Sequence, residues 1–163
     1  MPLTPFHLGP GLFLGFLTLK FFNLWAILLG SVLMDLEPII LIFAKKCYQC
    51  PHHLFFHSIL GAILGSLIIA AILRKFRGKL EKISFKLKIN QSFSFSVLFF
   101  SSLSAWVAHI FFDSLVHNDV FPFWPSKYNP FLINPDFYWP LSLIFLIIGI
   151  FSLILIYRKF KTR

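Results

Sequence analysis

The sequence predicts an all-α integral membrane protein that folds as a helical bundle. Of its 163 residues, 58% are hydrophobic and 23 are Phe, far more than the core of a soluble domain needs. Residues 54–73 contain His57 as their only ionisable side chain, and residues 141–157 contain no charge. Both stretches are long and apolar enough to span a bilayer. With the shorter apolar runs included, we expect roughly 4–6 apolar helices, including a short N-terminal hairpin.

That hairpin is predicted from two apolar runs, residues 6–19 and 24–34, which are separated by Lys20 and Asn23. Each run is about a dozen residues long, and at ~1.5 Å per residue it is shorter than the ~30 Å apolar layer of a bilayer. We therefore expect a tilted or re-entrant hairpin with Lys20 near its inner tip. Its second arm should end at residues 35–38, where a proline stops the helix.

Three membrane-crossing helices are expected to follow, over residues 54–73, 93–116 and 141–157. An alternating stretch within the linker between the first two, residues 83–89, should lie at the lipid surface or form a short strand. Residues 117–140 contain five prolines and many aromatic side chains, which is typical of an interfacial loop. No repeat or domain boundary is visible, so residues 1–163 form a single domain.

The net charge of +9 is concentrated beside the apolar segments. Seven Lys and Arg lie within residues 74–88 and four within residues 158–163. Basic flanks of membrane helices face the cytoplasm, so residues 74–91 are predicted to form a basic cytoplasmic linker and the C-terminus to be cytoplasmic. Topology and contact with anionic lipid explain these charges better than a nucleic-acid surface does. We expect a multi-pass protein of the plasma membrane with no nucleic-acid partner, and we predict no particular oligomeric state.

A metal site is predicted at the end of the helix expected over residues 93–116. His109, Asp113 and His117 recur every four residues, so they should stack on one helix face. Imidazole nitrogen together with carboxylate oxygen suits zinc, manganese or iron. Ionisable groups inside a membrane segment are costly and usually functional. We expect one or more divalent ions, with zinc preferred and manganese or iron left open.

The topology deduced from charge brings more candidate ligands to the same level, near the outer membrane face. The predicted cluster consists of His7, Asp35, Glu37, His53, His57, His109, Asp113 and His117. Eight candidates exceed the three or four ligands of one zinc ion, so the cluster holds two or more metals or mixes ligands, bases and supporting residues. Asp35 or Glu37 is the predicted general base.

Two neighbouring assignments stay open. His53 lies four residues before His57 and would share a helix face with it, whereas His52 lies five residues before it. His53 is therefore preferred as a metal ligand, and His52, His117 and Asp119 are further candidates. A single Cys-x-x-Cys pair, Cys47 and Cys50, is weak evidence for a zinc knuckle, and a disulfide or a pair of unligated thiols is preferred on the outer side.

Four motifs, taken in order, resemble the YdjM-like family of predicted membrane-bound, metal-dependent hydrolases. They are Thr-Pro-Phe-His at residues 4–7, Met-Asp-Leu-Glu-Pro at 34–38, His-Leu-Phe-Phe-His-Ser at 53–58, and His-x-x-x-Asp at 109–113 followed by Val-Phe-Pro-Phe-Trp-Pro at 120–125. The resemblance covers most of the chain. The family is in turn distantly similar to zinc-dependent phospholipase C, an all-α enzyme that holds several zinc ions with His and Asp.

This resemblance implies a phosphoester-type hydrolase. It assigns metal-binding or catalytic positions to His7, Asp35, His53, His57, His109 and Asp113. A His-Arg-Gly pattern found in many members would align His52 with the family's first His, whereas a shorter His-Gly-Phe-Phe-His form would align His53. The resemblance therefore leaves the choice between His52 and His53 open.

The preferred function is a membrane-embedded, metal-dependent hydrolase that acts on a phosphoester or lipid-linked substrate through metal-activated water. An ion or metal transporter would distribute its ligands through the depth of the bilayer and show an internal repeat, and the sequence shows neither. A non-catalytic membrane anchor or partner-binding protein would leave the His/Asp cluster unexplained. Type-2 phosphatidic acid phosphatases also use His-x-x-x-Asp, but their Pro-Ser-Gly-His motif is absent here.

Overall fold

The computed structural model describes residues 6–45 and 53–161, and throughout these residues the regular structure is helical. The helices are α1 (Leu8–Leu17), α2 (Leu24–Gly30), α3 (Leu36–Lys45), α4 (Ile59–Lys75), α5 (Arg77–Lys86), α6 (Phe95–Val116) and α7 (Tyr138–Lys161). Short 3-10 turns lie at Leu33–Asp35, Phe55–His57 and Pro135–Phe137. The predicted all-α fold is confirmed, with α5 as the one polar helix among those described.

Three helical stretches are long and apolar enough to cross a membrane: Leu24–Leu41, Phe95–Val116 and Pro135–Arg158. A fourth candidate span consists of α4 and α5 together, a pair bent by 77°. The helix predicted from residue 54 begins instead at Ile59, because the Ser58 side chain caps it by accepting a hydrogen bond from the Gly61 N–H at 3.1 Å.

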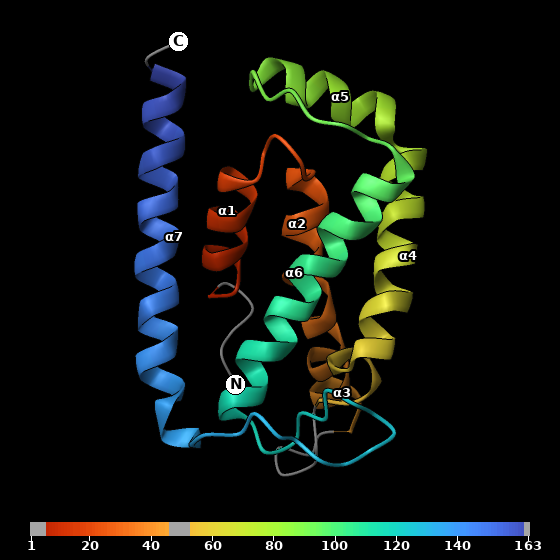
Figure 1. The fold of residues 1–163 in the computed structure, drawn as a ribbon, viewed down its shortest axis with the longest axis vertical. Helices are drawn as coiled ribbons and strands as arrows, with labels where there is room; N and C mark the ends of the chain where they lie inside the picture. The colour runs from red at the N-terminus through yellow and green to blue at the C-terminus, as the bar shows by residue number, and fades with distance from the viewer. Residues whose placement is uncertain (1–5, 46–52, 162–163) are drawn as a thin grey trace.

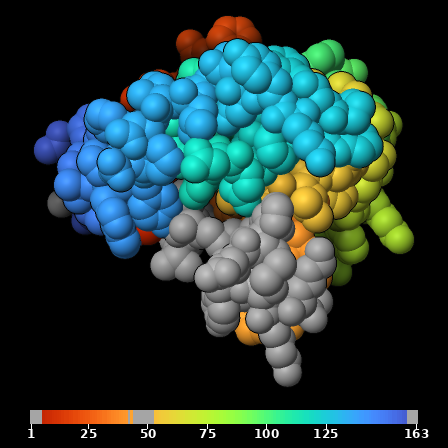
Figure 2. Space-filling model, turned by 90° about the horizontal axis from the view of Figure 1, so that it is seen from below, coloured from red at the N-terminus to blue at the C-terminus, as the bar shows by residue number. Residues whose placement is uncertain are grey.

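The helices form a bundle in which α7 packs against α1, α1 against α2, α2 against α6, and α6 against α4 (Figure 1). Helix α5 lies across one end of this bundle, and the turn between α1 and α2, which contains Lys20, lies at the same end. The segment that joins α6 to α7 lies at the opposite end and spreads over that face (Figure 2). The basic linker and the proline-rich segment are therefore at opposite ends of the molecule. Their assignment to the two sides of the membrane stays a prediction.

Two local predictions are wrong. Pro38 does not stop a helix; it lies in the first turn of α3, where its missing N–H breaks no intrahelical hydrogen bond. The chain breaks earlier, after Gly30, and the 3-10 turn Leu33–Asp35 follows. Of the two alternatives for residues 83–89, the strand is wrong, because residues up to Lys86 belong to α5, whose exposed face carries an ion pair between Arg77 and Glu81 at 2.7 Å. The alternative position at the lipid surface stays a prediction.

Several helices approach one another so closely that only glycine fits at the contact, as at Gly9 and Gly65. A Cβ at Gly9 of α1 would lie 2.1 Å from the backbone oxygen of Phe145 in α7. A Cβ at Gly65 of α4 would lie 2.0 Å from the Trp106 ring in α6. Small residues permit this close contact in apolar surroundings. Trp106 also donates from Nε1 to the Phe56 carbonyl at 2.9 Å, which fixes the turn that precedes α4.

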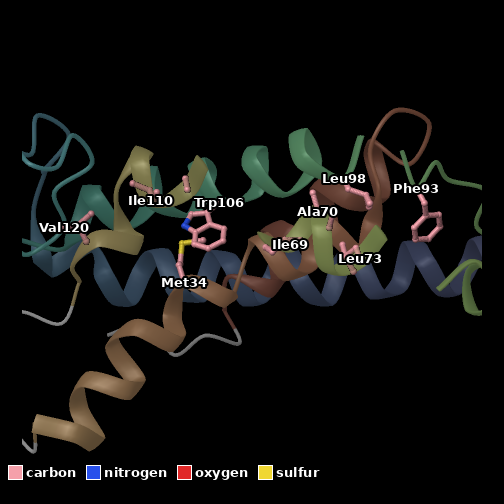
Figure 3. Close-up of a cluster of buried hydrophobic side chains, with 11 residues drawn as sticks. Met34, Ile69, Ala70, Leu73, Phe93, Leu98, Trp106, Ile110 and Val120 are labelled. Atoms are coloured by element: carbon pink, nitrogen blue, oxygen red, sulfur yellow. The ribbon is translucent and has the colours of Figure 1, made fainter. Parts of the chain in front are cut away.

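The buried apolar core lies mainly between α4 and α6 and extends toward the end where α6 stops (Figure 3). At that end Met34 lies beside Trp106, and Ile110 and Val120 are also almost fully buried. Met34 precedes Asp35 in the chain, and Ile110 follows His109. Polar residues of the predicted site are therefore anchored directly by neighbours in the apolar core.

Candidate metal centre

Four buried side chains from separate parts of the chain converge near the end of α6. His109 and Asp113 come from α6, Asp35 from the turn after α2, and His57 from the turn before α4. His109 Nε2 lies 3.0 Å from Asp113 Oδ2 and 3.3 Å from Asp35 Oδ1. His57 Nε2 lies 3.6 Å from Asp35 Oδ1 and 3.8 Å from Asp113 Oδ2. All four side chains are less than a tenth exposed.

The spacing of these four groups fits a single metal ion. With metal–ligand bonds of ~2.0–2.2 Å, the ligand atoms of a tetrahedral site lie about 3.4 Å apart. The separations above range from 3.0 to 3.8 Å, and the four groups can each offer a ligand atom within 4.8 Å of every other. Two imidazoles and two carboxylates form a donor set suited to zinc, manganese or iron.

Unpartnered polar atoms support the same conclusion. Among the described residues, six buried side-chain nitrogen or oxygen atoms have no hydrogen-bond partner, and five of them belong to the predicted cluster. These five are His7 Nε2, Asp35 Oδ2, His57 Nε2, Asp113 Oδ1 and His117 Nε2. Burying such atoms without partners is costly. Coordination of a cation would satisfy them.

Three histidine rings of the cluster are held through their Nδ1 atoms. His109 Nδ1 lies 2.8 Å from the Ser31 carbonyl oxygen, His57 Nδ1 lies 3.1 Å from Glu37 Oε2, and His53 Nδ1 lies 2.9 Å from Asp119 Oδ1. A carbonyl only accepts, so His109 Nδ1 carries a proton, and its Nε2 faces Asp35 and Asp113. Metal-binding histidines are usually oriented by such an acceptor on the other ring nitrogen.

Glu37 holds the segment that carries His57. Its carboxylate accepts hydrogen bonds from the backbone N–H groups of Leu54 at 3.0 Å and Phe56 at 3.2 Å, besides its contact with His57 Nδ1. It therefore contacts the side of the imidazole opposite to the nitrogen that approaches Asp35 and Asp113. This geometry favours a positioning role for Glu37, and the predicted general-base role of Glu37 or Asp35 stays a prediction.

A second group of potential ligands consists of His53, Asp113 and His117. The prediction that His117 continues the helix face of His109 and Asp113 is wrong, because α6 ends at Val116 and His117 is extended, with φ −114° and ψ 122°. Its ring instead packs against His53, with 4.8 Å between centroids. Burial lowers the pKa of His117 to about 4, so at neutral pH the ring is in the uncharged form that binds metals. Asp113 belongs to both groups.

His53 and His57 do not share a helix face, contrary to the prediction, because His53 precedes the 3-10 turn in which His57 lies. Their rings meet edge to face, with centroids 4.5 Å apart. The two histidines nevertheless belong to the same cluster, one in each ligand group. The long-range contacts of Glu37 and Asp119, not helical periodicity, bring them together.

His7 completes the cluster from the N-terminal end of α1. Its ring stacks on His109, with centroids 3.6 Å apart and planes inclined by 16°. Its Nε2 lies 3.2 Å from Asp113 Oδ1, although without hydrogen-bond geometry. Burial, and next the nearby His109, lower the pKa of His7. His7 thus presents a neutral ring nitrogen to Asp113.

The structure brings most of the predicted site residues together. His52, Cys47 and Cys50 lie outside the described residues, so their assignments stay predictions. Sequence reasoning missed the Ser31 carbonyl as the partner of His109, because a backbone acceptor leaves no signal in the residue types. It named Asp119 only as a possible ligand, whereas the structure shows its carboxylate holding His53.

A family model described as "YdjM inner membrane protein" matches residues 1–163. No curated protein and no solved structure gives a significant match.

Proposed function

The chain belongs to the YdjM inner membrane protein family, as its four motifs predicted, and we propose that it is a membrane-embedded, metal-dependent hydrolase of phosphoester or lipid-linked substrates. The observation that carries this proposal is the convergence of two imidazoles and two carboxylates in a buried site that shares Asp113 with a second ligand group. The chemistry of the ligands supports zinc first, with manganese or iron as alternatives. The distant similarity to zinc-dependent phospholipase C that the sequence motifs imply stays a prediction, and it would imply the same class of reaction.

The two ligand groups suit different roles. Asp35, His57, His109 and Asp113 provide four ligands, which is typical of a closed, structural site. His53, Asp113 and His117 provide three, which leaves a position for water or a substrate oxygen. We therefore assign the reaction to the His53/Asp113/His117 group. A divalent metal there would lower the pKa of its bound water toward ~7 and polarise a phosphoryl oxygen.

The protein residues around this position hold the reacting groups in place. Asp113 fixes the distance between the two ligand groups because its single carboxylate belongs to both. Asp119 holds the His53 ring through Nδ1. Asp35 is a better candidate than Glu37 for accepting a proton, since it would bind metal through only one of its two carboxylate oxygens whereas Glu37 accepts from two backbone N–H groups.

The proposal is tested by Asp113→Asn in protein purified in mild detergent without chelator. Wild-type protein should contain at least one zinc, manganese or iron per chain and hydrolyse one or more phosphoesters in a screen. The variant should lose both metal and turnover, because an amide is a poor substitute for a carboxylate ligand. Glu81→Gln, which changes an exposed carboxylate on α5, is the matched control and should behave as wild type. Metal content and turnover unchanged in Asp113→Asn would refute the proposal.

A further inference from the structure

An apolar cavity of about 240 Å³ lies between α1, α6 and α7. Leu14 from α1, Ala108 from α6 and Ile148 from α7 line it, and Phe13, Phe112 and Phe145 close it further. Besides Ser31, the polar side chains of its lining are those of His7 and His109. The cavity therefore has hydrocarbon walls with two imidazoles among them.

The surroundings of the cavity decide what can occupy it. Helices α6 and α7 are candidate membrane spans, and residues of α7 such as Leu143 and Ile147 are more than half exposed, as expected for side chains that contact lipid. Phe13, Leu14 and Ile148 are only half-buried, so the cavity reaches the apolar surface of the bundle. Water is not retained in a space with so few polar partners, whereas a hydrocarbon chain fits it.

The imidazole rings of His109 and His7 lie between the cavity and the metal centre. His109 lines the cavity and places its Nε2 3.0 Å from Asp113 Oδ2. His7 also lines it and places its Nε2 3.2 Å from Asp113 Oδ1. A lipid whose chain enters between α1, α6 and α7 would therefore bring its polar head close to the carboxylate that both ligand groups share.

We propose that this cavity binds one hydrocarbon chain of a phosphate-bearing membrane lipid, and that such a lipid is the substrate of the hydrolase. This inference rests on the proposed function, and it names the substrate class and the helices that select it. A volume of about 240 Å³ is below the ~300–1,000 Å³ of pockets that enclose a drug-sized molecule. The cavity therefore holds the part of one chain nearest the head group, and the rest of the lipid stays in the bilayer.

The test is photochemical labelling in lipid nanodiscs, which requires no turnover. The probe is a phosphatidic acid that carries a diazirine on one acyl chain near the glycerol, and labelled residues are mapped by peptide mass spectrometry. Labelling should concentrate on Leu14, Ala108 and Ile148. Even labelling along the lipid-facing residues of α7, such as Leu143 and Ile147, would overturn the proposal.

Two substitutions on α6 provide a matched pair. Ala108→Phe fills the cavity and should remove most of the labelling at Leu14 and Ile148. Val107→Phe introduces the same ring at the adjacent, exposed position and should leave the labelling unchanged. Leu14→Trp fills the cavity from α1 and provides the same test if Ala108→Phe does not fold. Labelling that persists in a folded, filled variant would overturn the proposal.

Further experiments separate this inference from the proposed function and identify the class of lipid that supplies the hydrocarbon chain. Asp113→Asn should lose metal but keep cavity labelling, because the cavity does not depend on the ion. Wild-type protein that hydrolyses phosphoesters but shows no preferential cavity labelling with any lipid probe would refute the inference alone. Labelling by a polyprenyl phosphate probe in place of phosphatidic acid would support a lipid substrate and assign it to the prenyl class.

Discussion

Asp113 occupies the centre of the site, because three imidazoles approach its carboxylate. His109 lies 3.0 Å from it, His7 3.2 Å and His57 3.8 Å. With no more than a fiftieth of its surface exposed, this side chain is shielded from bulk solvent, so its charge needs compensation from the protein or from bound ions. A buried carboxylate in that position requires cations around it, and two metal ions bridged by one carboxylate would meet that requirement.

The two ligand groups predict how metal is lost when individual ligands are removed. Wild-type protein should bind two metal ions per chain. His117→Ala should remove one ion and keep the other, since His117 belongs only to the group with His53. His57→Ala should remove the ion of the other group. Elemental analysis of the purified variants measures both results, and loss of all metal in His117→Ala would show that the groups do not bind independently.

Glu37 is predicted to act on metal affinity through His57. Glu37→Gln keeps the size of the side chain but weakens the acceptor at His57 Nδ1, and loss of such an orienting partner typically lowers metal affinity ~10–100-fold. Competition with a chromogenic chelator measures the change, with Glu81→Gln as the control. An unaltered affinity would mean that His57 keeps its orientation without a charged acceptor at Nδ1.

Metal affinity should also fall as the pH is lowered. Burial lowers the pKa of His57, but the nearby carboxylates of Asp35 and Glu37 outweigh that effect and raise the pKa above its ordinary value of 6.5. A metal ion needs the deprotonated ring, and because the pKa of His57 is raised, protons compete with the metal more strongly as the pH falls. The check is to measure zinc affinity from about pH 5 to about pH 8, the range in which histidine side chains normally change charge. A pH-independent affinity would contradict it.

The His109/Asp113 pair was predictable because a four-residue spacing within a long helix has one geometric outcome. The position of His117 was not predictable, because the end of α6 is held by Asn129, which lies in the following loop. Asn129 donates from Nδ2 to the carbonyl oxygens of Ser114 at 2.8 Å and His117 at 3.4 Å. A cap supplied from the following loop leaves no trace in the local sequence pattern.

At the scale of elements, the long apolar helices were predicted best. Residues 93–116 and 141–157 correspond to α6 (Phe95–Val116) and α7 (Tyr138–Lys161), because predominantly apolar runs of that length form helices in a membrane. The start of α4 was placed too early. Residues 54–57 are apolar enough to suggest a helix. Two of their backbone N–H groups instead donate to the Glu37 carboxylate, and the segment forms a 3-10 turn.

The contact between α1 and α7 predicts a stability difference between two glycines. Gly9→Ala places a methyl group against the Phe145 carbonyl, where backbone must move, whereas Gly78→Ala on α5 meets nothing within 4 Å. Overpacking of this kind costs about 1–3 kcal/mol. Thermal unfolding in detergent should show a lower midpoint for Gly9→Ala and no loss for Gly78→Ala, which also gains helix propensity. Equal midpoints would mean that α1 is not held tightly against α7.

Gly9→Ala should in addition change the site, because α1 carries His7 to the stack with His109. The expected result is reduced metal affinity together with reduced stability. A destabilised variant with wild-type metal affinity would show that His7 contributes to packing and not to the ligand environment.

At the scale of the whole molecule, the described His and carboxylate ligands gather near one end of the bundle, and the basic helix α5 lies across the other (Figure 1). This gathering argues against a transporter, whose ligands would be distributed along a path through the membrane. The charge distribution predicted that the ligands and the basic linker lie at opposite ends, and which of these ends faces the cytoplasm stays a prediction.

The orientation itself can be tested by placing single cysteines at the two ends of the molecule, in a background with Cys47→Ser and Cys50→Ser. Ser126→Cys lies in the exposed segment between α6 and α7, and Gly78→Cys lies on the exposed surface of α5. Because α5 carries basic residues, the positive-inside rule places it in the cytoplasm. In intact spheroplasts a membrane-impermeant maleimide should label Ser126→Cys, and it should label Gly78→Cys only after lysis. The reverse pattern would put the metal centre on the cytoplasmic side, and the lipid substrate would then come from the inner leaflet.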